Sequence, residues 1–401
     1  MTPFERSARL LALPRYLFAD LERKRHEAEA AGREVLDVSI GDPDLPTPPA
    51  VLDRLCEAAR DPRNHRYPTS AGLPGARRDI ARWFGERFGV TLDPLHEVAV
   101  LIGSKEGIGH FPLAALNPGD EALVPDPGYP VYAAGTVFAG ATPVRYPLRE
   151  SDGFVPDLAV LDRLVTPRTR VVTVNYPNNP TGATAPAAFY TNLAAWAARR
   201  DLLVVSDAAY SEVYYDEPPG SALSAPAARE RTIEFHSFSK TFNMTGWRIG
   251  FAAGAAPLIE ALVALKANVD SGAPQAIQLA AVSGLARLAV HGPAIRGVYR
   301  ERRDLALDAL RRMGCPIRTP GGAFYLWGRV PAGERSMDFV TRVFEKTGVL
   351  LTPGNGFGGE GEGYFRIALT CPVDRLSRAL QKLEALAPWS RSHVSSGSAA
   401  R

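Results

Sequence analysis

Short apolar runs rich in Val, Leu and Ile alternate with longer amphipathic stretches through the first two thirds of the chain. They lie at residues 98–102, 121–124, 170–174, 202–206, 232–236 and 248–251. Continuous apolar runs of this length are typical of strands that are buried on both faces of a parallel sheet. Because helical patterns separate the runs, the sequence predicts a large α/β domain with a mostly parallel sheet over residues 48–287.

The pattern changes toward the C-terminus, where a charged stretch with helical periodicity covers residues 294–313. Strand-like runs follow it at residues 323–327, 349–352 and 364–369. This mixed order predicts a smaller α+β domain over residues 288–389, completed by residues 1–47. Residues 390–401 are rich in Ser, Ala and Arg and show no periodicity, so we expect a disordered tail there.

Composition and charge argue against several classes of protein. The chain has 401 residues, 22% of them charged, and its formal net charge is only +3 because 46 Lys and Arg are nearly balanced by 43 Asp and Glu. The basic residues are also scattered among the acids. A basic patch that would bind nucleic acid is therefore not expected. The three cysteines, Cys56, Cys315 and Cys371, fit neither a disulfide framework nor a metal or redox motif, which favours a cytoplasmic location. No apolar stretch is long enough to predict a membrane span.

The segment from Ser237 to Gly250 carries the most informative chemistry. Lys240 lies between two hydroxyl residues just after an apolar run, and Arg248 follows eight positions later. A lysine amine can form an imine with an aldehyde cofactor, and burial can lower its pKa so that it also acts as a base. Hydroxyls and a guanidinium around it suit a phosphate. Taken alone, this lysine could equally be a surface residue in a loop.

A carboxylate and a phenol follow another predicted strand. Asp207 comes directly after the run at residues 202–206, and Tyr210 follows three residues later. A carboxylate at the carboxyl end of a buried strand points into the crevice where α/β folds bind ligands. There it could keep a pyridinium nitrogen protonated, and Tyr210 could hydrogen-bond a phenolic oxygen of the same cofactor. The alternative for Asp207 is a helix N-cap.

Two more predicted strands lead into polar turns. The run at residues 170–174 precedes Asn179 in an Asn-Pro-Thr-Gly turn, which either points Asn179 at the same crevice or is purely structural. The run at residues 98–102 precedes Ser104 and Lys105 and looks like a strand that enters a helix N-terminus. Free N–H groups and the helix dipole at such a terminus form an anion site.

In this order, the segments resemble the class I/II aminotransferases of pyridoxal-phosphate (PLP) fold type I, the aspartate aminotransferase-like fold. The resemblance runs from about Leu13 to Leu386 and is greatest to the LL-diaminopimelate aminotransferases. It rests on residues 13–18, 41–46, 65–68, 102–107, 126–130, 175–182, 237–250 and 354–358. The resemblance implies a PLP enzyme that moves an amino group between an amino acid and a 2-oxo acid.

The resemblance also implies roles for individual residues. Lys240 would hold the cofactor as an imine and move the proton, while Asp207 would hold the pyridine nitrogen. Asn179 and Tyr210 would hold the phenolic oxygen, and Tyr129 would lie against the ring face. The phosphate would be held by Ser104, Lys105, Ser237 and Arg248, helped by Tyr67 from a second subunit. The resemblance thus implies a homodimer with shared active sites.

Substrate recognition is implied at three positions. Arg366 matches the family's arginine for the substrate α-carboxylate, where a bidentate clamp would orient the Cα–H bond. Its alternative is an ordinary strand arginine that pairs with a surface acid. Gly41 would let the backbone approach the same carboxylate, and Asn179 would also face the substrate. The chain departs from the diaminopimelate group at Pro274 and Cys371, two positions that we expect to shape the pocket.

The substrate pair implied by the resemblance is LL-2,6-diaminopimelate with 2-oxoglutarate, in lysine biosynthesis. Three alternatives stay open. The enzyme could act on alanine, aspartate, an aromatic amino acid or succinyldiaminopimelate with the same catalytic residues. It could be a PLP-dependent C–S lyase, which cleaves a different bond. It could also be a non-catalytic PLP-binding regulator, although no DNA-binding segment is expected ahead of the fold. No metal site is expected, because the seven histidines show no metal-binding spacing.

Overall fold

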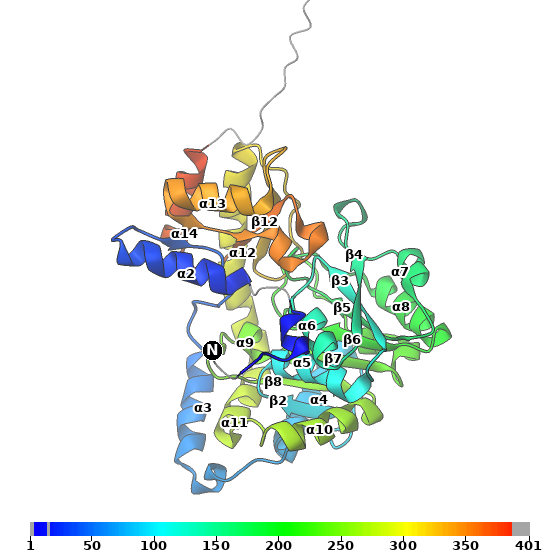
Figure 1. The fold of residues 1–401 in the computed structure, drawn as a ribbon. Coiled ribbons are helices and arrows are strands. Elements are labelled where there is room, and N and C mark those ends of the chain that lie inside the picture. Colours follow the sequence, from blue (N-terminus) through cyan, green and yellow to red (C-terminus); the bar gives the residue numbers. More distant parts are fainter. Residues whose placement is uncertain (1–3, 14–16, 387–401) are drawn as a thin grey trace, which may run out of the picture.

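A seven-stranded sheet forms the centre of the larger part of the molecule (Figure 1). The computed structural model describes residues 4–13 and 17–386, so the predicted tail at residues 390–401 lies outside the described residues. The strand order is β2-β8-β7-β6-β5-β3-β4. The strands are β2 (Val98–Leu101), β3 (Glu121–Asp126), β4 (Thr142–Pro147), β5 (Thr169–Asn175), β6 (Leu203–Asp207), β7 (Thr232–Ser237) and β8 (Gly250–Gly254).

The prediction of a mostly parallel sheet is confirmed, with one strand reversed. Strands β4, β3, β5, β6 and β7 pair in parallel, whereas β8 is antiparallel to both β2 and β7. The apolar run at residues 248–251 had suggested another parallel strand, because such a run indicates burial and not direction. Strand β4 was missed, since it lies at the sheet edge and its side chains are mostly not buried.

Helices cover both faces of this sheet, which explains the continuous apolar runs. Alternate residues of β2 join different cores: Ala99 and Leu101 pack with α5, α6 and α10, whereas Val98 and Val100 pack with α4 and α11. At the other end of the sheet, helices α7 and α8 cover the same face as α4 and α11. The helices are α3 (Pro49–Arg60), α4 (Pro74–Phe88), α5 (Ser104–Ala115), α6 (Val131–Phe138), α7 (Leu158–Leu164), α8 (Ala187–Arg199), α9 (Phe238–Thr241), α10 (Ala256–Val269) and α11 (Gln275–Leu285).

The remaining strands form two small sheets in the C-terminal part. Strands β11 (Thr352–Pro353), β12 (Tyr364–Ala368) and β9 (Tyr325–Arg329) form an antiparallel sheet in the order β11-β12-β9. Strand β1 (Leu36–Asp37) pairs in parallel with β10 (Val349–Leu350), so the predicted run at residues 349–352 is divided between two sheets. The helices here are α12 (Leu288–Arg312), α13 (Ser336–Thr347) and α14 (Val373–Glu384).

The N-terminal segment joins this C-terminal part. Helix α2 (Leu17–Ala30) lies beside α13 in Figure 1, and Lys24 Nζ donates to Thr341 Oγ1 at 3.2 Å. Arg33 donates to the carbonyl of Phe344, which fixes the chain just before β1. The short helix α1 comprises Ala8–Leu11, and single 3₁₀ turns are η1 (Pro62–His65), η2 (Glu150–Asp152), η3 (Ala222–Ser224), η4 (Pro226–Ala228), η5 (Gly354–Phe357) and η6 (Gly359–Gly361). The division into two domains at residues 47 and 287 stays a prediction.

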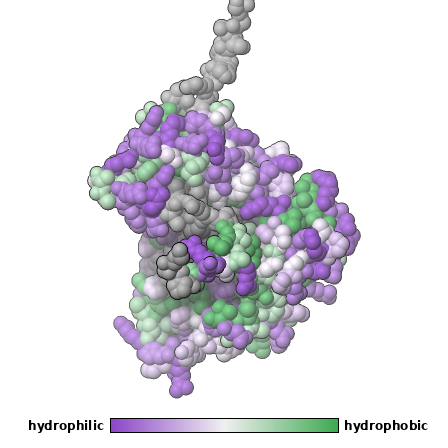
Figure 2. All heavy atoms as spheres, viewed as in Figure 1, coloured by the Kyte–Doolittle hydropathy of each residue, from purple (hydrophilic) through white to green (hydrophobic). Residues whose placement is uncertain are grey.

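The surface differs between the two parts. Figure 2 shows mostly hydrophilic side chains over α2, α13 and α14, whereas hydrophobic side chains gather over α3 and α11. Within the described ranges, no helix combines the length and the apolar character needed to cross a membrane.

Candidate active site

One cavity of about 430 Å³ opens at the carboxyl ends of the parallel strands. The ends of β2, β5, β6 and β7 meet at this edge of the sheet, so the residues that follow them face a common space. All residues predicted to hold the cofactor or the substrate α-carboxylate, except Tyr67, line it: Gly41, Ser104, Lys105, Tyr129, Asn179, Asp207, Tyr210, Ser237, Lys240, Arg248 and Arg366. The reversed direction of β8 explains the place of Arg248, because β8 begins at the edge where its neighbours end.

The side chain of Lys240 lines this cavity. Strand β7 ends at Ser237, and the single-turn helix α9 then carries Lys240. Its Nζ donates to the carbonyl oxygen of Gly41 at 3.0 Å and lies 5.6 Å from the ring centre of Phe324. Burial lowers the pKa of Lys240 to about 8, although the nearby Asp42 acts in the opposite direction. Close to neutral pH, this amine can therefore both lose and regain a proton.

The carboxylate of Asp207 is buried at the end of β6 and is held on both oxygens. Tyr132 donates its hydroxyl to Oδ2 at 2.6 Å, and the Ala209 N–H donates to Oδ1 at 3.0 Å. Burial raises the pKa of Asp207, while these two hydrogen bonds oppose the rise. Tyr132 was not predicted as a site residue; it lies in the first turn of α6, three residues after Tyr129.

A cup lined by Ser104, Lys105 and Arg248 lies where β2 ends and α5 begins. Gly103 has φ +79°, and a Cβ at this position would overlap the guanidinium of Arg248, so only glycine fits on both counts. The cup combines the N-terminus of α5 with two cations, because Lys105 and Arg248 both face it. Burial, and then the neighbouring Arg248, lower the pKa of Lys105. Backbone N–H groups, hydroxyls and a guanidinium in one cup suit a phosphate.

The guanidinium of Arg366 reaches the cavity from β12. Its side chain is 2% exposed, Nη1 donates to Asn179 Oδ1 at 2.8 Å, and Nη2 donates to the Ser39 carbonyl at 2.7 Å. The Tyr325 ring centre lies 4.2 Å from the guanidinium carbon. An arginine fixed in this way has its charge directed into the cavity, which suits a substrate carboxylate and not a surface ion pair.

The two tyrosines Tyr210 and Tyr325 connect the walls of the cavity. Their hydroxyl oxygens lie 2.9 Å apart, and burial raises the pKa of Tyr210 well above its usual value. A Cβ on Gly41 would overlap the Tyr325 hydroxyl, so the glycine is required by this close approach. Tyr325 was not predicted from the sequence, and neither were several other lining residues: Glu22, Ile40, Asp42, Ile108, Ala209, Ser239 and Thr245.

Three sequence-predicted positions lie away from the cavity of the single chain. Tyr67 is 86% exposed and lines a separate surface hollow together with Pro274. Cys371 is buried and does not line the cavity. The expectation that Pro274 and Cys371 shape the pocket therefore finds no support within one chain, and the role of Tyr67 in a partner's site stays a prediction.

The residues present fit PLP. The cup offers cations and N–H groups for a phosphate, Lys240 offers an amine of lowered pKa for the aldehyde, and Asp207 offers a buried carboxylate for the pyridine nitrogen. Tyr129 adds an aromatic ring to the lining of the cavity, and its ring centre lies 5.8 Å from Lys105 Nζ.

Comparisons with known proteins agree with this geometry. Residues 33–383 match the family model described as aminotransferase class I and II. The LL-diaminopimelate aminotransferase of Nitratidesulfovibrio vulgaris (strain DSM 19637 / Miyazaki F) is 48% identical over 386 residues, covering 96% of this chain and 99% of that protein. That of Aquifex aeolicus is 47% identical over 384 residues, with 96% and 99% covered. A solved single mutant of Thermus thermophilus aspartate aminotransferase is similar with a TM-score of 0.91 and 29% identity, covering 96% and 100%.

Proposed function

Because the chain belongs to the class I and II aminotransferases, we propose that it transfers an amino group between LL-2,6-diaminopimelate and 2-oxoglutarate in lysine biosynthesis. It is a PLP-dependent transaminase. The substrate proposal is supported by relatives named LL-diaminopimelate aminotransferase, which are 47–48% identical over almost the whole chain. The observation that carries the reaction type is that the Lys240 amine, the Asp207 carboxylate and the Arg366 guanidinium face one cavity.

The chain's own residues would bind and orient both cofactor and substrate. When bound, PLP supplies an aldehyde that accepts the amino group and a ring that takes up the electrons of a broken Cα–H bond. Asp207, held by Tyr132, would keep a proton on the pyridine nitrogen, and Asn179 and Tyr210 would hold the phenolic oxygen. Ser104, Lys105, Ser237 and Arg248 would hold the phosphate.

Proton movement would belong to Lys240. Its amine, with a pKa of about 8, would take the proton from the substrate Cα and return it to the neighbouring cofactor carbon. Arg366 would grip the substrate α-carboxylate, and its bonds to Asn179 and Ser39 would prevent it from swinging away. This grip would orient the Cα–H bond toward Lys240.

A diamino substrate has a second ammonium group, which distinguishes it from alanine, aspartate and aromatic amino acids. The distal half of LL-diaminopimelate carries an ammonium as well as a carboxylate. Glu22 of α2 lines the same cavity as Lys240; its side chain is 58% exposed, and its Oε1 lies 3.7 Å from Arg25 Nη2. We assign the distal ammonium to Glu22.

A homodimer is part of the proposal. Tyr67 is exposed, and two large hydrophobic side chains, Leu52 of α3 and Val269 of α10, are 43% and 54% exposed. Figure 2 shows hydrophobic side chains gathered over α3. If Tyr67 serves the partner's site, then inactive Tyr67→Phe and Lys240→Ala proteins should regain a fraction of the activity when they are mixed and exchange subunits. No recovery in subunit-exchanged mixtures would contradict the shared site.

The test of the reaction is a half-reaction with single amino acids. The purified PLP enzyme is mixed with one amino acid, and loss of the imine absorbance is followed as pyridoxamine phosphate appears. Conversion by LL-diaminopimelate and glutamate, but not by alanine, aspartate or aromatic amino acids, is expected. Conversion only by one of the latter would replace the substrate and keep the chemistry. Release of pyruvate instead would support a C–S lyase, and no conversion by any amino acid would support a regulator.

A further inference from the structure

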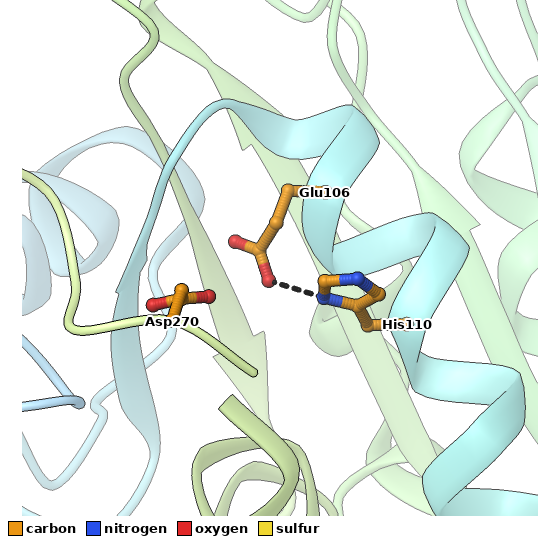
Figure 3. Close-up of side chains that lie close together, drawn as sticks. All are labelled: Glu106, His110 and Asp270. Atoms are coloured by element: carbon orange, nitrogen blue, oxygen red, sulfur yellow. Dashed lines mark hydrogen bonds and ion pairs between the residues drawn. The ribbon is translucent and has the colours of Figure 1, made fainter. Parts of the chain in front are cut away.

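A cluster of charged side chains lies behind the phosphate cup and outside the cavity. Figure 3 shows Glu106 and His110 on α5 facing Asp270, which follows α10. Candidate ligand atoms of these three side chains lie within 4.8 Å of one another, a spacing that could hold a metal ion. Glu106 Oε1 and His110 Nδ1 are hydrogen-bonded at 2.9 Å.

A lysine already supplies the cation of this cluster. Lys266 of α10 is 0% exposed, and its Nζ lies 2.9 Å from Glu106 Oε2 and 3.0 Å from Asp270 Oδ2. An ammonium between two carboxylates satisfies them and takes the place that a metal would need. We call Lys266, Glu106, Asp270 and His110 the Lys266 cluster.

The Lys266 cluster is bonded directly to the backbone that forms the cup. Glu106 Oε2 accepts the Ile102 N–H at 3.1 Å, so this one carboxylate bridges the end of β2 and the first turn of α5. Ser104, which opens the cup, lies between these two residues in the sequence. A carboxylate behind the cup would repel a bound phosphate, and the ammonium of Lys266 offsets the charge of Glu106.

The other end of the cluster reaches the segment that carries Tyr67. Asp270 Oδ1 accepts the Gly272 N–H at 2.7 Å. Gly272 has φ +83°, and a Cβ there would lie 3.1 Å from the Pro68 ring and 3.2 Å from the Thr69 carbonyl. Lys266 thus links the cup, through Asp270, to the Gly272 loop. This loop contacts Pro68 and Thr69, which follow Tyr67 in the sequence.

We propose that Lys266 is a positioning residue for the cofactor's phosphate, acting by holding and neutralising Glu106 behind the cup. The proposal rests on the proposed function to the extent that the cup must bind the phosphate of PLP. Lys266 does not line the cavity, so it would act on the phosphate only through Glu106. The measured quantity is therefore the affinity for phosphate groups, in addition to activity.

The test compares Lys266→Met with wild type in the full-chain protein. The dissociation constant of PLP is measured by equilibrating holoenzyme with free PLP, and inorganic phosphate is titrated as a competitor of PLP loading. We expect both constants to rise by roughly tenfold, the lower end of the effect of removing a group that orients ligand-holding residues. Lys266→Arg, which keeps the charge, should recover part of the affinity.

A double variant and a matched control separate charge from stability. Glu106→Gln/Lys266→Met removes the carboxylate together with the ammonium, so it should bind PLP more tightly than Lys266→Met alone. If the single variant does not fold, the PLP affinity of the double variant can still be compared with that of wild type. The matched control is Arg168→Met, which breaks an ion pair to the buried Glu121. Glu121 is the first residue of β3, so this pair lies at the amino ends of the strands, opposite the cavity. Arg168→Met should lower the melting temperature without changing PLP affinity.

Two results would overturn the positioning role. One is unchanged affinity for PLP and inorganic phosphate in Lys266→Met. The other is a double variant that binds PLP as weakly as the single variant, because the carboxylate would then not be the cause. Failure of the proposed function is distinguishable, since wild-type protein would then not bind PLP or would not convert LL-diaminopimelate.

Discussion

Replacing Arg366 by lysine removes the planar donor set from the proposed substrate grip while keeping its charge. Two of the guanidinium nitrogens donate to Asn179 and to the Ser39 carbonyl. A lysine has three donors, so once it satisfies these two acceptors it keeps only one N–H for the substrate carboxylate. One charge-assisted hydrogen bond of about 1.5–3 kcal/mol is lost, which corresponds to a fall in kcat/KM of roughly 10- to 150-fold.

The assay is the kcat/KM of the half-reaction for LL-diaminopimelate and, separately, for glutamate. Both should fall by a similar factor, because both substrates present the same α-carboxylate, while the PLP dissociation constant should stay unchanged. Arg329→Lys is the matched control, since Arg329 lies on the neighbouring strand β9, pairs with Glu150 and does not line the cavity. A variant whose kcat/KM stays within about twofold of wild type, or which loses PLP, would refute the assignment of Arg366 to the substrate.

Three further predictions follow from the same cavity. Because burial lowers the pKa of Lys240 to about 8, the folded apoenzyme binds fewer protons than the unfolded chain between pH 8 and 10.5. Its unfolding free energy should rise through this window, and Lys240→Met should melt above wild type at pH 7 but not near pH 10.5. Tyr132→Phe removes a hydrogen bond of about 1.5–3 kcal/mol from the buried Asp207, so kcat should fall at least about tenfold with substrate KM nearly unchanged. Glu22→Gln should lower kcat/KM for LL-diaminopimelate about fivefold relative to glutamate, as expected for one solvent-exposed ion pair of about 1 kcal/mol, whereas Glu27→Gln on the same helix should leave this ratio unchanged.

The strands could be predicted because burial on two faces leaves a clear trace in the sequence. The predicted run at residues 232–236 and the observed β7 agree to within one residue. The direction of a strand leaves no such trace in the sequence. The reversal of β8, and the position that it gives Arg248, could therefore be seen only in the structure. Strand β4 lacks a continuous apolar run because its side chains are only partly covered, and it was missed for that reason.

The site could be anticipated where side chains follow strands that share one edge. Asp207, Asn179 and Lys240 come together because β6, β5 and β7 are neighbours in the sheet. Hydroxyl partners were not predictable in this way. Tyr132 bonds to Asp207, 75 positions away in the sequence, and Tyr325 bonds to Tyr210, 115 positions away. Contacts between residues so far apart in the sequence depend on how helices and sheets pack.

The pairing of β1 with β10 sets an order of events during synthesis. Leu36 pairs with Val349, and Ser39 and Gly41, which follow β1, accept hydrogen bonds from Arg366 and Lys240. At about 5–20 residues per second, the ribosome makes residue 349 roughly 15–60 seconds after residue 36. The nascent N-terminal strand must wait that long for its partner, so a chain that has not yet reached β10 and β12 lacks the part of the cavity wall that Arg366 supplies.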